Sequence, residues 1–206
     1  MTKFTKEEYL NDPCMVSSLP FWKTKTFSIP ESIQVIRDDL YKDGYQNDCR
    51  YFKMLHRLNK IGEAYLPTGF VIFDASINEY VHHINSCYEE EHVEDDELEQ
   101  YKCRPTYNSK LWIAIKDINT NVIVATAIGE VDLEINEGIL EWIQVSKEYR
   151  KRGLGTFLVN SLLIKMKPLV DFVTVSGRID NPTNPMQLYK TCGFENCVIW
   201  HVVRNI

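Results

Sequence analysis

The stretch from Ile139 to Lys167 constrains the fold of this chain more than any other part of the sequence. It starts with the apolar segment ILEWIQV, passes through the basic turn YRKRGLG, and ends in the apolar-rich segment TFLVNSLLIKMK. Branched and aromatic residues in the first segment favour a strand. From the end of the turn onward, Leu154, Phe157 and Leu162 recur at helical spacing, and Pro168 ends the pattern. The sequence therefore predicts a strand, a tight basic turn and a helix in direct succession.

This turn has the chemical features of a pyrophosphate-binding site. Gly153 and Gly155 let the backbone approach a ligand closely because they carry no Cβ. The first turn of a helix presents unpaired N–H groups and a partial positive charge, which together bind phosphate groups. Arg150, Lys151 and Arg152 add cationic side chains. The pattern RxxGxG also occurs in ordinary surface turns, but here it stands between a strand and a helix, the context that a phosphate site requires.

The other periodic segments predict the fold class. From residue 69 onward, strand-like segments are 69–73, 111–116, 122–131, 139–145, 172–176 and 197–203, and helical segments are 76–88, 153–167 and 185–191. Three antiparallel strands in succession are the simplest interpretation of residues 111–145. We therefore predict an α/β (α+β) fold in which a mostly antiparallel central sheet is flanked by helices.

Residues 1–68 are predicted to form an N-terminal extension that precedes this domain of residues 69–206. Three prolines lie within the first 32 residues and predict an irregular arm with turns. Apolar positions between residues 31 and 62 have spacings that suit helices. The extension is therefore expected to be partly helical.

Composition excludes several classes of protein. The net charge is −6, and the segment 89–99 (EEEHVEDDELE) holds eight acidic residues; without them the rest of the chain has a net charge of +2. A basic surface for nucleic acid is therefore not expected, whereas the acidic segment is either a solvated surface or an attraction for a cationic substrate. No apolar run is long enough to cross a membrane, and no secretion signal is evident, so a cytoplasmic protein is expected. The six cysteines form no CxxC pair and are expected to be reduced.

Two motifs together resemble the GNAT superfamily of N-acetyltransferases. The segment EWIQVSKEYRKRGLG (141–155) is similar to the most specific motif of that family, and NPTNPMQLYKTCGF (181–194) is similar to the second. The resemblance covers roughly residues 69–206. Lys147 stands where the family often has a proline, and the asparagine before the last helix is either Asn181 or Asn184.

The resemblance implies acetyl-CoA as co-substrate. No metal is expected, because the sequence shows no set of three or four ligands at fixed spacing. The pyrophosphate would lie on the turn, and the pantetheine arm would pair with the strand at Val145. The implied coenzyme-binding residues are Val145, Arg150, Lys151, Arg152, Gly153, Leu154, Gly155, Thr156, Asn181 and Asn184. The acceptor would be a small-molecule or peptide amine, with no nucleic acid or membrane partner, and the protein a monomer or a homodimer.

Direct attack of an amine on a thioester requires three groups. A base or a water chain must remove a proton from the amine; we predict Glu141 as this base, with Glu130 and Asp132 in reserve. An oxyanion donor is needed, which a backbone N–H near Val145 can supply. The departing thiolate needs a proton, and Tyr189 matches the tyrosine that supplies it in the family.

Two alternatives keep the fold but change the function. The first is a non-catalytic acyl-CoA-binding or regulatory module. The second is a transferase for longer acyl groups, against which the bulky Trp142 and Phe172 argue.

Several other side chains are not expected to have a functional role. His83 and Cys87 are spaced to share a helix face but have no further metal ligands at fixed spacing. His201 is interpreted as a satisfied strand residue, and Cys192 lacks an activating neighbour.

Overall fold

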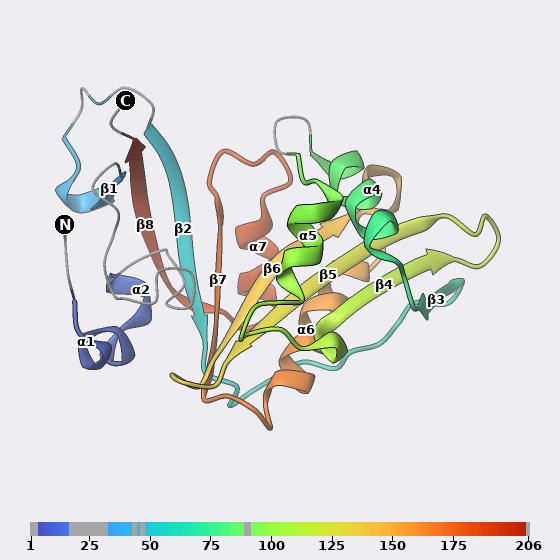
Figure 1. The fold of residues 1–206 in the computed structure, drawn as a ribbon, viewed down its shortest axis with the longest axis horizontal. Helices are drawn as coiled ribbons and strands as arrows, with labels where there is room; N and C mark the ends of the chain where they lie inside the picture. The colour runs from blue at the N-terminus through green and yellow to red at the C-terminus, as the bar shows by residue number, and fades with distance from the viewer. Residues whose placement is uncertain (1–3, 17–32, 43–44, 46–47, 89–91, 205–206) are drawn as a thin grey trace. The chain divides into compact units, whose positions relative to one another are not determined.

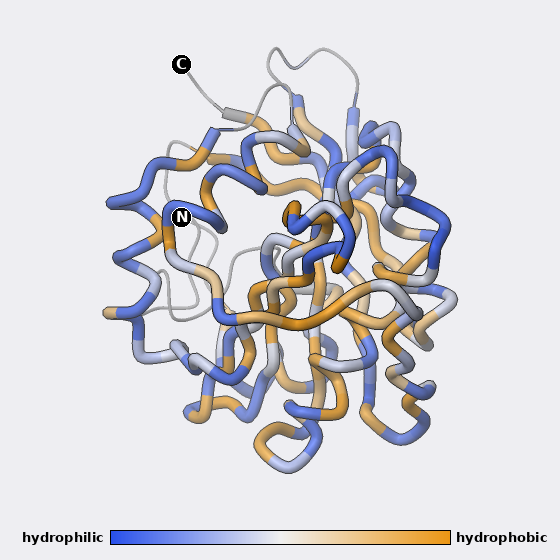
Figure 2. The backbone as a smooth tube through the Cα atoms, turned by 90° about the vertical axis from the view of Figure 1, so that its right-hand side faces the viewer, coloured by the Kyte–Doolittle hydropathy of each residue, from blue (hydrophilic) through white to orange (hydrophobic). Residues whose placement is uncertain are grey.

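A computed structural model of the chain describes residues 4–16, 33–42, 45, 48–88 and 92–204. The chain divides into two compact units, one formed by residues 1–57 and 174–206 and the other by residues 58–173. Hydrophobic and hydrophilic stretches alternate along the backbone (Figure 2). Among the described residues, no helix is both long and apolar enough to cross a membrane.

The unit of residues 58–173 contains the strand–turn–helix stretch. Its strands are β3 (Phe70–Phe73), β4 (Trp112–Asp117), β5 (Ile123–Asp132) and β6 (Glu137–Val145). Each of these strands pairs antiparallel with the next, in the order β6-β5-β4-β3. The antiparallel arrangement of β4, β5 and β6 confirms the prediction for residues 111–145. Helices α4 (Ile77–Cys87) and α5 (Asp95–Tyr101) cover one face of these strands, and α6 (Leu154–Met166) covers the other (Figure 1).

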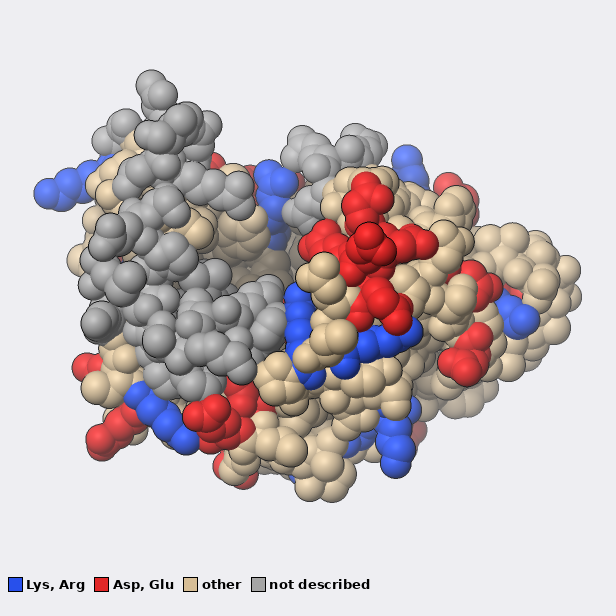
Figure 3. Space-filling view, in the orientation of Figure 1, with Lys and Arg blue, Asp and Glu red and all other residues tan. Residues whose placement is uncertain are grey.

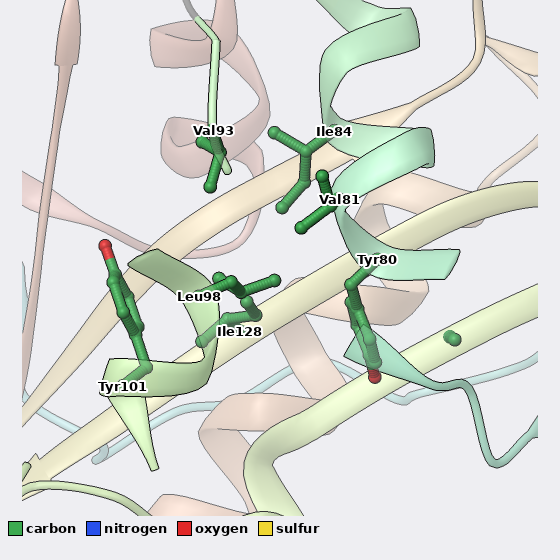
Figure 4. Packing of buried hydrophobic residues seen from close by; sticks show 8 residues of the cluster. Tyr80, Val81, Ile84, Val93, Leu98, Tyr101 and Ile128 are labelled. Carbon is green, nitrogen blue, oxygen red and sulfur yellow. The ribbon is translucent and has the colours of Figure 1, made fainter. Parts of the chain in front are cut away.

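Helix α4 begins at a capping box formed by Ser76 and Glu79. The Ser76 hydroxyl accepts from the Glu79 N–H at 3.3 Å, and the Glu79 carboxylate accepts from the Ser76 N–H at 2.7 Å. This reciprocal pair satisfies two backbone donors at the helix start. The helix then turns Tyr80 and Ile84 toward Ile128 of β5, where residues of α5 also converge (Figure 4). Burial of this apolar stripe fixes α4 against the sheet.

Two glycines let helix α6 pack closely on the opposite face. A Cβ on Gly129 of β5 would lie 2.6 Å from the Met166 side chain, and a Cβ on Gly138 of β6 would lie 2.8 Å from the Met166 sulfur. Any larger residue at either position would push the end of α6 away from the strands. The position of α6, and with it the turn that precedes the helix, therefore depends on these small residues.

The unit of residues 1–57 and 174–206 is built on a second set of strands. It contains α1 (Lys6–Asn11), α2 (Pro13–Val16), β1 (Ile33–Arg37), the short 3-10 helix η1 (Asp38–Leu40), β2 (Asp48–His56), α7 (Pro185–Thr191) and β8 (Glu195–Arg204). Strand β8 lies between β1 and β2 and is antiparallel to both. Strand β7 (Phe172–Arg178) crosses the boundary between the two units.

The prediction of helices between residues 31 and 62 is wrong. Residues 33–37 and 48–56 are strands, because each contributes a side of the β8 ladder, and this long-range pairing overrides the local spacing. The helical part of the N-terminal region lies earlier, in α1 and α2. The part of the predicted irregular arm at residues 17–32 lies outside the described residues.

Candidate active site

The basic turn has a backbone that a phosphate-binding turn requires. After β6, the chain passes through η3 (Lys147–Tyr149), and then Lys151 and Gly153 adopt left-handed conformations with φ of 61° and 85°. Gly153 is the N-cap of α6, where no side chain caps the helix. A left-handed residue there turns the chain sharply into the helix at no steric cost. The 13 residues of α6 then begin directly at the turn.

The start of α6 offers three backbone donors. Phe157 is the first residue whose N–H bonds within the helix, to the Gly153 carbonyl at 2.9 Å. The N–H groups of Leu154, Gly155 and Thr156 have no hydrogen-bond acceptor among the described residues. Unpaired N–H groups at the positive end of a helix dipole bind anions. The turn therefore fits the pyrophosphate of a coenzyme.

The three basic residues of the turn differ in their contacts. The Arg150 guanidinium donates through Nε to the Val145 carbonyl at 3.1 Å, whereas Arg152 donates to the Glu148 carbonyl at 3.2 Å and lies over the Tyr149 ring. Lys151 is exposed. All three cations lie on the turn or fold back over it, which favours an anionic ligand there.

Strand β6 carries a bulge just before the turn. The register of β5 and β6 shifts between Thr126, opposite Gln144, and Ile128, opposite Glu141, so two residues of β6 face a single residue of β5. Trp142 in the bulge has a φ of 35°. Bulges redirect backbone groups out of the ladder and often lie beside active sites. The bulge was not foreseen, because β-propensity does not show an extra residue in a ladder.

Val145 turns its backbone groups away from β5. It lies opposite Ala125, and the neighbouring Ser146 N–H donates to the Val124 carbonyl at 2.9 Å. Because hydrogen-bonded and non-hydrogen-bonded pairs alternate in an antiparallel ladder, the N–H and C=O of Val145 point to the other edge of β6. This orientation suits the predicted backbone contact with a pantetheine arm.

The predicted base Glu141 lies half-buried on the sheet face covered by α5. Glu130, one of the two reserve candidates, is buried beside it. Burial raises the pKa of Glu130, and the neighbouring Glu141 carboxylate raises it further. Glu130 already accepts from Thr106 at 2.8 Å and pairs with Arg104 at 3.2 Å. Glu130 therefore has a structural partner, whereas Glu141 is the more accessible of the two carboxylates.

Asp132, the other reserve candidate, closes a turn. Its carboxylate accepts from the Glu134 N–H at 2.9 Å at the end of β5, and its side chain is buried. This is the role of an aspartate in a local turn. Nothing in these contacts favours it as a base over Glu141.

Tyr189 is held by aromatic packing within its own unit. The residue is buried, and its ring contacts Phe52 and Phe194 with centroid distances of 6.0 and 5.6 Å. A Cβ on Gly177 of β7 would lie 2.7 Å from the Phe52 ring. The glycine thus leaves room for the phenylalanine that supports Tyr189.

Asn181 and Asn184 build the turn before α7. The Asn181 side chain accepts from the N–H and the hydroxyl of Thr183 at 2.9 and 2.7 Å. Asn184 is the N-cap of α7, with a left-handed φ of 48° and no side-chain cap bond. Both residues belong to one unit with Tyr189, and the turn from Arg150 to Thr156 belongs to the other. Their contact with a coenzyme stays a prediction.

The structure agrees with the interpretation of His201 and Cys192 as residues without a catalytic role. The ring nitrogens of His201 lie 2.7 Å from Asp48 and 3.0 Å from Asp38, and Tyr41 stacks on the ring, so His201 is a satisfied strand residue as predicted. Burial raises the pKa of Cys192 to about 11, which keeps its thiol protonated and unreactive. Within the described part of the chain, no three His, Cys, Asp or Glu side chains are placed to hold a metal ion.

The acidic segment contains a helix that the sequence did not predict as a separate element. Helix α5 begins in it, and Asp95, Asp96 and Glu97 occupy the first turn, where carboxylates complement the helix dipole. Acidic side chains gather on this face, with basic side chains beside them (Figure 3). Glu99 pairs with Lys102 at 3.0 Å. These contacts are those of a solvated helix surface.

The chain belongs to the acetyltransferase (GNAT) family, whose sequence model matches residues 77–194, more than half of the chain. No curated protein matches the sequence.

Solved structures share the fold at low sequence identity. A GCN5-related N-acetyltransferase from Sphaerobacter thermophilus has a TM-score of 0.65 and 16% identity, over 84% of this chain and 59% of that one. A putative acetyltransferase of the family from Novosphingobium aromaticivorans has a TM-score of 0.53 and 14% identity, over 87% and 70%. Ard1 from Thermoplasma volcanium has a TM-score of 0.53 and 15% identity, over 67% and 100%. The chain thus spans less than two thirds of the Sphaerobacter protein.

Proposed function

We propose that this chain transfers an acetyl group from acetyl-CoA to a primary amine of a small molecule or peptide. The amine attacks directly, in a complex that holds both substrates. The observation that carries this proposal is the turn between β6 and α6. This turn contains two left-handed residues and three cations, and it leads to three helix N–H groups that have no acceptor in the described part of the chain. Membership of the family supports acetyl-CoA as the donor.

In this proposal the turn binds the coenzyme and the bulge binds the thioester. The backbone from Arg150 to Thr156 holds the pyrophosphate, and Val145 pairs with the pantetheine arm. Because the bulge at Trp142 directs backbone groups out of the ladder, it is the place where a backbone N–H can stabilise the oxyanion.

The reaction forms a C–N bond and breaks a C–S bond. Glu141, directly or through water, takes the proton that the attacking amine must lose. The amine nitrogen then attacks the carbonyl carbon, and the C–S bond electrons leave with the sulfur. Tyr189 gives a proton to that thiolate. The half-buried position of Glu141 and the fixed ring of Tyr189 support these roles.

Calorimetric titration with acetyl-CoA and free CoA tests the coenzyme site. We expect micromolar binding that Gly155→Glu abolishes, because a carboxylate at the helix start would repel the pyrophosphate. Gln100→Glu, an exposed position on α5, adds the same charge elsewhere and is expected to bind as the original chain does. Absence of binding to the original chain would refute the acyltransferase proposal.

Tyr189→Phe separates the enzyme from a non-catalytic acyl-CoA-binding module. The enzyme is expected to lose turnover in an amine screen, by roughly 10²-fold if the tyrosine acts as a general acid, while the dissociation constant for CoA stays nearly unchanged. An unaltered rate would show that Tyr189 is not the acid. The cytoplasmic location and the oligomeric state stay predictions.

A further inference from the structure

A buried histidine links the turn and the bulge described above. His83 of α4 is only 2% exposed. Its Nδ1 lies 2.9 Å from the Thr126 hydroxyl of β5, and its Nε2 lies 3.0 Å from the Ser146 hydroxyl, at the entry of the turn. A buried polar side chain with a partner on each nitrogen orders the groups that it joins.

The network continues from Thr126 to the bulge. The Gln144 side-chain amide suits its neighbours only with its nitrogen toward the Trp142 carbonyl, so that it also donates to the Thr126 hydroxyl at 3.1 Å. In the opposite orientation Thr126 would donate to the amide oxygen, but that oxygen would then face the Trp142 carbonyl oxygen. The amide therefore caps the carbonyl of the bulge residue.

One set of bond directions is consistent with this orientation of Gln144. In it, the Thr126 hydroxyl accepts from Gln144 and donates to His83 Nδ1, and Nε2–H donates to the Ser146 hydroxyl oxygen. The ring also bonds to the backbone carbonyl of Val124. Burial lowers the pKa of His83 to about 4, so the ring is neutral at pH 7 and carries the single proton that this pattern requires. The Ser146 hydroxyl also bonds to the neighbouring Cys87 thiol, which extends the network along α4.

Cys87, one helical turn beyond His83, shows that this end of α4 lies beside the turn. Its sulfur is 3.8 Å from His83 Nε2. Burial raises the pKa of the Cys87 thiol, and the charges of Arg150 and Glu148 act on it as well. The His83 face of α4 is therefore next to the residues that would bind the coenzyme.

We propose that His83 is a positioning residue that keeps the coenzyme-binding turn and the thioester-binding bulge in fixed relation. This inference rests on the proposed function. One nitrogen of the ring fixes Ser146, where the turn begins, and the other fixes Thr126, which orients the Gln144 amide on the bulge. The two halves of acetyl-CoA, pyrophosphate and thioester, would bind on either side of this link.

Two substitutions separate the two halves of the link. His83→Asn places an amide near the Nδ1 position and keeps the Thr126 contact, whereas His83→Gln reaches the Nε2 position and keeps the Ser146 contact. We expect His83→Asn to weaken binding of CoA and acetyl-CoA equally, by about five- to tenfold for one hydrogen bond. His83→Gln is expected to bind CoA normally but to lose any preference for acetyl-CoA over CoA.

Calorimetry with CoA and acetyl-CoA, together with the free energy of unfolding, decides between this role and a merely structural one. His82→Asn and His82→Gln, at the exposed neighbouring residue, are the matched controls. If either His83 variant fails to fold, Ser146→Ala replaces His83→Asn, and Gln144→Leu replaces His83→Gln. The inference would be refuted if both His83 variants lost the same free energy of unfolding while their dissociation constants for CoA and acetyl-CoA stayed unchanged. If the original chain binds neither CoA nor acetyl-CoA, the proposed function itself fails. If the original chain and the His83 variants bind both compounds equally well, only the role of His83 is refuted.

Discussion

Removal of the buried imidazole is expected to change how the chain responds to acid. The pKa of His83 is about 4 in the folded chain, because of burial, against 6.5 for an ordinary histidine. Below pH 6.5 the unfolded chain binds a proton that the folded chain does not bind until near pH 4. Stability is therefore complete above pH 6.5 and falls as the pH decreases, by about 3 kcal/mol at pH 4.

The substitution His83→Gln removes this contribution of His83 to the pH dependence of stability. The variant loses one buried hydrogen bond, about 1 kcal/mol, at every pH, so the original chain is the more stable at pH 7. At pH 4 the order reverses, and the variant is the more stable by about 2 kcal/mol, with the two curves crossing at roughly pH 6. Urea unfolding at intervals from pH 4 to pH 7 measures both curves.

Other groups also act on the imidazole. A charge on His82 lowers the pKa of His83 further, whereas the hydrogen bond to the Val124 carbonyl raises it, and both effects disappear with the ring. Cys87 on α4, and Glu148 and Arg150, which act on Cys87, are present in both proteins. His82→Gln, an exposed histidine on the same helix, is the control for loss of a histidine in general. A difference in stability between His83→Gln and the original chain that is the same at pH 4 and pH 7 would refute the buried, neutral state of His83.

Three further substitutions test the packing that supports the site. Gly138→Ala is expected to cost about 1–3 kcal/mol in urea unfolding, because the new methyl group meets the end of α6; no loss would show that α6 moves freely. Arg104→Met leaves Glu130 buried without its cation and is expected to cost about 3–5 kcal/mol, more than Glu130→Gln, which keeps a polar group toward Thr106; the reverse order would contradict a paired carboxylate. Gly177→Ala displaces the ring that supports Tyr189 and is expected to slow acetyl transfer roughly 10- to 100-fold with unchanged CoA affinity; an unchanged rate would separate this packing from the chemistry.

The sequence was most informative where local pattern and tertiary structure agree. The helix that starts near residue 76, the strand–turn–helix stretch and the antiparallel strands of residues 111–145 each depend on residues close together in the chain. The succession of β6, a basic turn and α6 is therefore confirmed, whereas the left-handed conformations of Lys151 and Gly153 were not predicted. Short-range hydrogen bonding and glycine conformations leave a visible pattern in the sequence.

The missed features depend on partners distant in the sequence. The local spacing in β1 and β2 predicts helices, but both segments are strands because they pair with β8, which lies about 150 residues further along the chain. His83 was noted only for its spacing from Cys87, since its true partners, Thr126 and Ser146, lie 43 and 63 residues away. No spacing rule connects such residues, so the network could be recognised only from the fold.

The turn between β6 and α6 is fixed at both of its ends. Its entry is bonded to β5 through Ser146, and its exit continues into the buried Leu154 at the start of α6. Little conformational freedom is left to the residues between, and two of them already have the left-handed conformations of a closed turn. A ligand would therefore bind without ordering a long loop, and its affinity would not be reduced by the entropy that such ordering costs. Amide hydrogen exchange at these residues should change little when a coenzyme binds, apart from the protection of the helix N–H groups that it contacts directly.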